Sequence, residues 1–237
     1  FRRVLFRSHY YLFMKFNLIT IFPQIFDSYL NEGILKRAAL KKIVKYKIHN
    51  LRDYTNDKHK TVDDTPYGGG AGMLMKIEPL YKALNTIKKL SGKNKIKKRK
   101  VLLMSAAGKN WNQSLAKKYS KLEEIVIICG RYEGVDARIK HFIDEEISVG
   151  DYVLTGGELP ALTIIDSITR LIPGVLGNKE SIIEESHSEE GITEYPQYTR
   201  PEIFKVGNKK YPIPKILLSG DHKKIKQWRE DKKQTKK

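Results

Sequence analysis

An apolar run that ends in a glycine-bearing loop, IVIICGRYEG at residues 125–134, decides the fold of this chain. Two further runs have the same form: VLLMSAAG at residues 101–108 and EISVGDYVLTGGE at residues 146–158. Short, continuously apolar runs that alternate with helix-like segments are typical of parallel strands covered on both faces. These runs therefore predict an α/β fold built on a parallel sheet.

Strand and helix signals extend outward from these three runs. MKFNLITIFP, residues 14–23, predicts a buried first strand that stops at its proline. Apolar residues at helical spacing predict helices over residues 24–43, 77–90 and 159–171, the last closed by a Pro-Gly pair at residues 173–174. No internal repeat is visible, so we expect a globular α/β domain rather than a repeat array.

Length and composition exclude several classes of protein. The chain has 237 residues, enough for one large or two modest domains, and its 40% hydrophobic content is well above that of a disordered chain. No apolar run approaches the roughly 20 residues that span a bilayer, so we do not expect a membrane protein. The single cysteine, Cys129, excludes an internal disulfide framework and a thiolate zinc cluster. A reducing, cytoplasmic setting is expected.

The charge is large and unevenly distributed. The formal net charge is +18, with a sequence pI near 9.7. Residues 123–202 nevertheless hold 17 of the 27 acidic residues and six of the 45 basic ones, so the rest of the chain is strongly basic. An even coat of lysine can be a solubility device. The asymmetry favours a polyanionic partner for the basic parts, most simply a nucleic acid, with an anionic membrane surface as the alternative.

Changes in composition divide the chain into four parts. Residues 1–13 are rich in arginine and aromatic residues but lack the apolar region of a signal peptide, so we expect a non-native or upstream extension before Met14. Residues 14–177 carry the strand and helix signals of the main domain. Residues 178–196 are polar and acidic, which predicts a flexible interdomain linker, and residues 197–237 predict a small, mainly helical C-terminal domain with a lysine-rich end.

Three glycine-bearing loops at the carboxyl ends of parallel strands predict a ligand crevice. Glycines allow the backbone to approach a ligand closely, although any single one of these loops could be only a tight turn. No GxGxxG follows a strand, and GKN at residues 108–110 lacks the spacing of a phosphate-binding loop. We therefore expect a ligand without phosphates, held mainly by backbone amides and carbonyls.

The side chains that could carry chemistry are carboxylates and arginines. The six histidines show no metal-ligand spacing, and no GxSxG motif supports covalent hydrolysis, so no metal site is predicted. Each remaining candidate also has an ordinary interpretation as a surface charge or a helix ion pair, as for a carboxylate and an arginine at i, i+4. The candidates are Asp63, Asp64, Glu133, Asp166, Arg170, Glu184 and Glu185.

Four motifs, in this order along the chain, carry a specific resemblance: TVDDTPYGGGAGM at residues 61–73, CGRYEGVD at 129–136, GDYVLTGGELP at 150–160 and YTRPE at 198–202. Together they resemble the bacterial tRNA (guanine-N1)-methyltransferases, the TrmD family of the SPOUT superfamily. The resemblance runs from Met14 to about Arg229. A GGGAG run alone would carry little weight.

The resemblance implies a SPOUT-type parallel sheet with a deep trefoil knot, and a homodimer whose active site lies at the subunit interface. It implies that S-adenosylmethionine binds in the knot and that the substrate is tRNA, methylated at N1 of the guanosine 3′ to the anticodon when a G precedes it. It also implies that residues 197–237 form a tRNA-binding domain, shortened in this chain. A magnesium requirement is also implied. By motif match, the cofactor-binding residues are Ser105, Gly130, Tyr132, Glu133, Gly134, Val149, Gly150, Asp151, Tyr152, Val153, Leu154, Gly156, Gly157 and Pro160.

For catalysis, the resemblance implies a carboxylate base in the linker and an arginine in the helix before the PGVLG turn. The arginine matches Arg170, and the base position holds Glu185 where the family has aspartate. Glu184, by a shift of register, or Asp63 from the opposite subunit are the alternative bases. His187 replaces the family's phenylalanine in the same segment.

Two further departures qualify the resemblance. AA at residues 106–107 stands where the family loop has proline, and the chain ends eight residues after Arg229, where family members continue. Two other functions stay open at this point. One is a SPOUT relative that acts on rRNA, and the other is a non-catalytic RNA-binding protein that has kept the fold.

Overall fold

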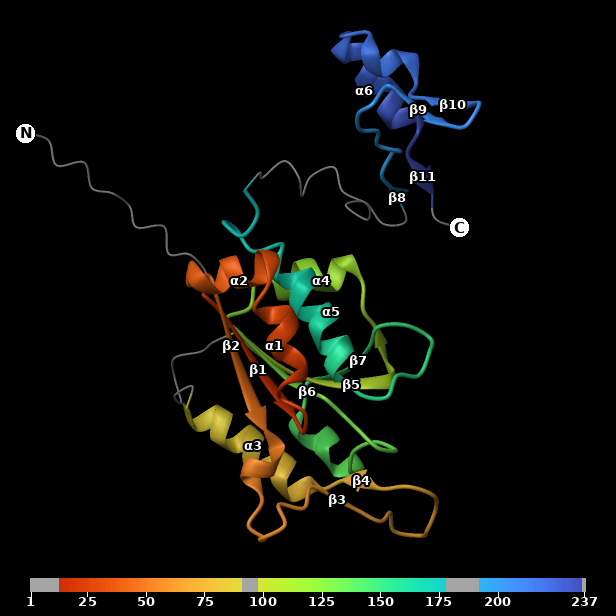
Figure 1. The fold of residues 1–237 in the computed structure, drawn as a ribbon. Coiled ribbons are helices and arrows are strands. Elements are labelled where there is room, and N and C mark those ends of the chain that lie inside the picture. The colour runs from red at the N-terminus through yellow and green to blue at the C-terminus, as the bar shows by residue number, and fades with distance from the viewer. Residues whose placement is uncertain (1–12, 91–97, 178–191, 236–237) are drawn as a thin grey trace, which may run out of the picture. The chain divides into compact units, whose positions relative to one another are not determined.

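The computed structural model describes residues 13–90, 98–177 and 192–235, and the chain divides into two compact units, Phe1–Gly177 and Asn178–Lys237 (Figure 1). No helix within the described ranges is long and apolar enough to cross a membrane.

The first unit is built on a five-stranded, all-parallel sheet. Its strands are β1 (Met14–Thr20), β2 (Val44–Asn50), β5 (Arg99–Asn110), β6 (Glu124–Ile128) and β7 (Glu145–Ser148), in the order β2-β1-β6-β5-β7. The predicted α/β class and its parallel sheet are confirmed. Strand β2 was not predicted, because VKYKIHN alternates lysine with apolar residues, as an edge strand does.

Helices connect these strands and cover the sheet. They are α1 (Ile25–Leu30), α2 (Gly33–Leu40), α3 (Ile77–Leu90), α4 (Gln113–Tyr119) and α5 (Glu158–Thr169), with 3-10 helices at Leu51–Tyr54 and Ala137–Phe142. The two-residue strands β3 (Asp63–Asp64) and β4 (Leu74–Met75) pair antiparallel. The helix predicted over residues 77–90 is confirmed. The single helix predicted over 24–43 is wrong: two helices meet there, because Gly33 takes a positive φ of 56° and breaks the first.

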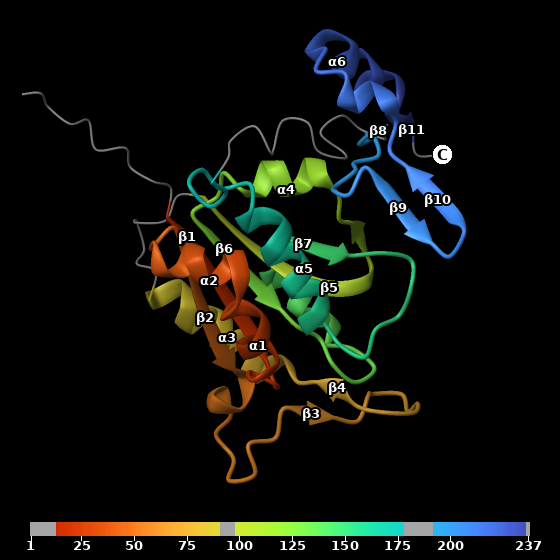
Figure 2. The same ribbon diagram turned by 45° about the horizontal axis from the view of Figure 1, so that its top comes forward.

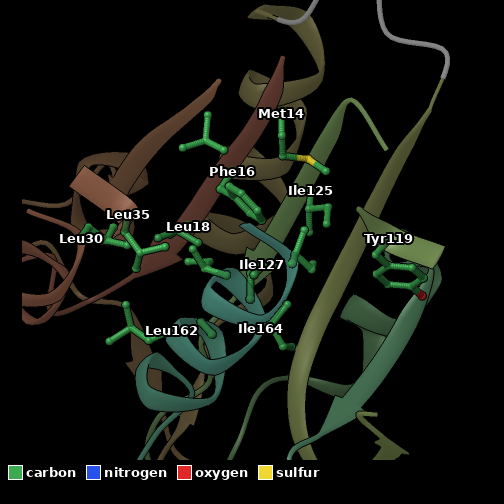
Figure 3. Packing of buried hydrophobic residues seen from close by; sticks show 14 of the residues in the cluster. Met14, Phe16, Leu18, Leu30, Leu35, Tyr119, Ile125, Ile127, Leu162 and Ile164 are labelled. Atoms are coloured by element: carbon green, nitrogen blue, oxygen red, sulfur yellow. The ribbon is translucent and has the colours of Figure 1, made fainter. Parts of the chain in front are cut away.

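Alternate residues of the central strands pack into two separate cores, one on each face of the sheet. Phe16, Leu18 and Ile127 point toward α1, α2, α4 and α5 (Figure 3). Ile19 and Ile128 point to the other face, where they pack with residues of α3. Each of these side chains is fully buried, which stabilises the fold by about 1.5–3 kcal/mol per residue. The prediction that both faces are covered is therefore confirmed.

The second unit is small and mixed. It contains α6 (His222–Asp231), a 3-10 helix at Lys215–Leu218, and two antiparallel pairs, β8 (Ile192–Thr193) with β11 (Gln234–Thr235) and β9 (Ile203–Val206) with β10 (Lys209–Pro212). Asp221 caps α6 by accepting a hydrogen bond from the amide of Lys224 at 3.1 Å. The expected basic helix is present. The two β-ladders were not predicted, because their strands are only two to four residues long.

Candidate functional site

A pocket of about 460 Å³ lies where β5, β6 and β7 end and α5 begins. Ligands of open parallel sheets bind at this edge, outside the carboxyl ends of the strands. The structure brings together 13 of the 14 predicted cofactor residues as lining of this one pocket, and only Asp151 lies outside it. The lining residues are Ser105, Gly130, Tyr132, Glu133, Gly134, Val149, Gly150, Tyr152, Val153, Leu154, Gly156, Gly157 and Pro160.

One wall of the pocket is an irregularity in the pairing of β5 with β7. Met104 and Lys109 both pair with Ile147, so the four residues between them loop out of the ladder. Gly108 ends this loop directly against β7, where a Cβ would lie 2.5 Å from the backbone nitrogen of Ile147. The loop therefore approaches β7 more closely than any side chain would permit, and it sets Ser105 beside the pocket.

The opposite wall depends on a second close backbone approach, at the start of α5. The amide of Gly157 donates a hydrogen bond to the carbonyl oxygen of Gly130 at 2.9 Å. A Cβ at Gly157 would lie 2.7 Å from Cα of Cys129 and 3.0 Å from Cβ of Met104. These contacts make the wall from backbone atoms, as the glycine motifs predicted.

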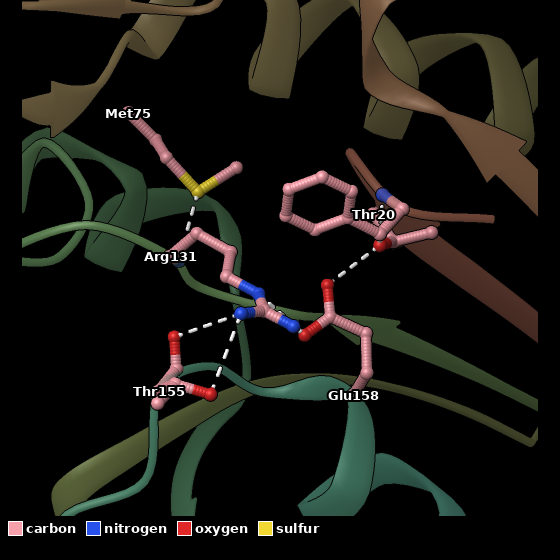
Figure 4. Close-up of polar contacts among 6 residues, drawn as sticks. Thr20, Met75, Arg131, Thr155 and Glu158 are labelled. Carbon is pink, nitrogen blue, oxygen red and sulfur yellow. Dashed lines mark hydrogen bonds and ion pairs between the residues drawn. The ribbon is translucent and has the colours of Figure 1, made fainter. Parts of the chain in front are cut away.

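Arg131 ties the loops of the pocket together (Figure 4). Its Nε donates to Glu158 at 2.9 Å, its guanidinium also donates to the carbonyl oxygen of Thr155 at 3.1 Å, and its amide contacts the sulfur of Met75 at 3.2 Å. Glu158 is only 1% exposed, and it also accepts a hydrogen bond from the hydroxyl of Thr20 at 2.7 Å. A buried carboxylate with these two partners holds the loop after β6 against the loop before α5.

Charged groups of both signs line the pocket. They are Arg131, Glu133, Lys140 and Glu146, and the ammonium of Lys140 lies 2.7 Å from a carboxylate oxygen of Glu146. Cys129, one residue before the loop, is fully buried, and this burial raises the pKa of its thiol well above the ordinary value. The thiol therefore stays protonated at neutral pH and is not a nucleophile.

Within the described residues of one chain, none of the predicted catalytic residues lines the pocket. Asp63 lies on β3 and pairs with Met75, and Arg170 is the C-terminal cap of α5; neither lines the pocket. Glu185, with its alternative Glu184, lies outside the described residues.

Four charged residues that shape the pocket were not predicted from the sequence: Arg131, Lys140, Glu146 and Glu158. Arg131 stood inside a quoted motif, and a charged residue next to a strand-ending glycine was the available signal. Lys140 and Glu146 carried no sequence signal, because both look like ordinary surface charges.

Comparison with known proteins gives one consistent result. The family model described as tRNA (Guanine-1)-methyltransferase TrmD matches residues 14–237. A tRNA (guanine-N(1)-)-methyltransferase of Clostridioides difficile is 52% identical over 219 residues, which is 92% of this chain and 91% of the relative. The tRNA (guanine-N(1)-)-methyltransferase of Dictyoglomus turgidum is 50% identical, over 91% of this chain and 83% of its own length.

A solved structure agrees with these relatives. The crystal structure of a tRNA (m1G37) methyltransferase from Aquifex aeolicus superposes with a TM-score of 0.74 at 40% sequence identity, and the match covers 91% of this chain and 87% of that one.

Proposed function

Because the chain belongs to the TrmD family of tRNA (guanine-N1)-methyltransferases, we propose that its glycine-walled pocket holds S-adenosylmethionine while the enzyme methylates N1 of guanosine-37 in tRNA. The observation that carries the proposal is the pocket itself. Thirteen residues chosen from sequence motifs converge on one cavity at the ligand-binding edge of a parallel sheet.

The pocket fits this cofactor in size and in chemistry. Its volume of about 460 Å³ lies within the range of small-molecule sites. Its walls are backbone and apolar groups, and it has no phosphate-binding loop. The four charged side chains, two of each sign, suit a ligand that carries a cationic sulfonium, an ammonium and a carboxylate. When bound, S-adenosylmethionine supplies an electrophilic methyl group.

The residues of the chain must then make N1 of guanine nucleophilic. N1 carries a proton, and its lone pair becomes available only as a base removes that proton. We propose the carboxylate of Glu185 as this base. We propose that the guanidinium of Arg170 stabilises the negative charge that develops on O6 as the proton leaves. The bound cofactor would supply the methyl carbon to this lone pair, and its sulfur would keep the electron pair of the broken carbon–sulfur bond.

The position of Arg170 supports a homodimer with shared active sites. Pro160 and Arg170 lie at opposite ends of α5, about 15 Å apart along the helix axis at 1.5 Å per residue. This separation is longer than an extended arginine side chain, so we propose that a second copy supplies Arg170 and Glu185 to each pocket. Exposed apolar side chains beside the pocket give that copy a surface to cover: Tyr132, Tyr152, Val153, Leu154 and Leu159.

Complementation tests the shared site. Mixing an Arg170→Ala variant with a Gly157→Ala variant should restore activity, because one of the two sites in a mixed dimer combines an intact pocket with an intact arginine. Failure of the mixture to regain activity, although mixed dimers of the two variants have formed, would contradict sharing. The proposal has two further parts. We propose that the first unit contains a trefoil knot, and that the reaction takes place in the cytoplasm, where tRNA is modified.

Substrate selection is tested with tRNA transcripts. We expect methylation of a transcript with G before the target guanosine and little methylation when A precedes it. Equal methylation of both would refute the proposed specificity. The same assay in EDTA, with magnesium then restored, tests the proposed magnesium requirement.

A further inference from the structure

The β9–β10 hairpin of the second unit is exposed along its whole length. All eight strand residues are exposed, although they include the large apolar side chains Ile203, Phe204, Val206 and Tyr211. Figure 2 shows β9 and β10 side by side, joined by a short turn. The two strands pair in register through a two-residue turn at residues 207–208. An isolated two-stranded ribbon is marginally stable in water, so apolar exposure on this scale indicates a partner.

One face of the hairpin is aromatic. Phe204 and Tyr211 lie directly opposite each other in the ladder, which places both rings on the same face. Their ring centroids are 6.5 Å apart with planes inclined by 38°, so the rings lie side by side rather than stacked. They are 58% and 53% exposed. Each ring therefore keeps surface available for a planar partner.

The other face carries an unfavourable charge pair. Lys205 and Lys210 are directly opposite each other, and like charges at such positions destabilise a ladder. Residues 203–212 contain no acidic residue and one more lysine, Lys209, beside the turn. In the described part of this unit, the ion pairs are those of Lys224 with Asp221 and of Lys233 with Glu230, and they do not include the hairpin lysines. A polyanion would relieve this repulsion.

We propose that the β9–β10 hairpin binds unpaired nucleotides of the tRNA, with bases stacking on Phe204 and Tyr211 and phosphates contacting Lys205 and Lys210. This inference rests on tRNA being the substrate. Aromatic side chains stack on bases of any sequence, and adjacent lysines neutralise the phosphates that connect them. The target guanosine lies in a loop of unpaired bases, so such nucleotides are present in the substrate. A protein partner packed on the rings would leave the repulsion between the two lysines on the other face unrelieved.

Salt dependence separates the two halves of the proposal. The equilibrium affinity of the full-length enzyme for tRNA is measured over a range of salt concentrations. Phe204→Ala with Tyr211→Ala should weaken binding roughly 5- to 150-fold per lost stack and leave the slope against log salt unchanged. Lys205→Gln with Lys210→Gln should lower the magnitude of that slope by about 0.7 per lysine that contacts phosphate. Leu40→Ala, which removes an exposed apolar side chain from α2, is the control.

A conservative double variant shows whether a loss of affinity comes from the lost rings or from misfolding of the hairpin. Phe204→Tyr with Tyr211→Phe keeps both rings and should keep the affinity. The alanine variant and the glutamine variant should each raise KM for tRNA and leave kcat and the affinity for S-adenosylmethionine unchanged.

Unchanged affinity and unchanged salt slope in the alanine and glutamine variants would overturn the proposal. A change of oligomeric state at constant tRNA affinity would overturn it too, because the hairpin would then face protein. The proposed reaction is tested separately: an enzyme that binds tRNA through the hairpin without methylating it refutes only the reaction.

Discussion

Replacing Arg131 with methionine should cost more stability than any surface charge change in the first unit. The change keeps the volume of the side-chain stem but removes the guanidinium that lies 2.9 Å from the carboxylate of Glu158. Glu158 is then left 1% exposed, and among the described residues it keeps the hydrogen bond from the hydroxyl of Thr20. Breaking a buried pair by removing one member costs about 3–5 kcal/mol, because the other charge stays buried without compensation.

Urea unfolding measures this loss. Trp111 lies in the first unit and donates a hydrogen bond to Ser167 at 2.9 Å, so its fluorescence reports on that unit once Trp228 is replaced by phenylalanine. At an m-value of about 2 kcal/mol/M, the midpoint should fall by roughly 1.5–2.5 M. The affinity for S-adenosylmethionine should fall as well, because the guanidinium also holds Thr155 beside the pocket.

Two further variants make the test specific. Arg138→Met removes an arginine that is 64% exposed and pairs with Asp136, so it should cost at most about 1 kcal/mol. The double variant of Arg131→Met with Glu158→Gln removes the buried charge together with its partner and should recover most of the lost stability. If Arg131→Met were no more destabilising than Arg138→Met, the account of Arg131 as the tie between the pocket loops would be wrong.

Three other changes test the site and the fold. Gly157→Ala should weaken S-adenosylmethionine binding at least tenfold in calorimetry, since its Cβ would lie 2.7 Å from a backbone atom; Gly177→Ala, with open space around it, should not. Glu185→Gln should nearly abolish turnover in a methyl-transfer assay and leave cofactor binding intact, whereas retained activity would exclude Glu185 as the base. Burial, followed by nearby lysines, lowers the pKa of His49 to about 4, so below pH 6.5 the unfolded chain binds more protons than the folded one. Stability measured by urea unfolding should therefore rise between pH 4 and pH 6.5, and His49→Gln should flatten that rise.

The parts of the fold that follow from local periodicity could be predicted from the sequence. The apolar run of β6 and the helical spacing of α3 leave little choice of structure. The edge strand β2 could not be found in this way, because its lysines face solvent and interrupt the apolar pattern. The break between α1 and α2 depends on one residue, Gly33, that helices also tolerate.

The pocket was predictable to the extent that glycine motifs define it. Backbone walls need glycine wherever two segments approach closely, as at Gly157, and this requirement is visible in the sequence. The electrostatic support of the pocket was not visible. Arg131 pairs with a residue 27 positions later, and that residue bonds to Thr20, which is 138 positions earlier. Only the folded chain brings such partners together.

Nucleoside mass spectrometry tests the central claim most directly. Unmodified tRNA transcript with G before the target guanosine is incubated with the enzyme and S-adenosylmethionine that carries a deuterated methyl group, then digested to nucleosides. The account predicts deuterated 1-methylguanosine, located at position 37 by fragment mapping, and its loss in the Glu185→Gln variant. Label on another base or another atom of guanine, or no label with folded enzyme that binds the cofactor, would contradict it.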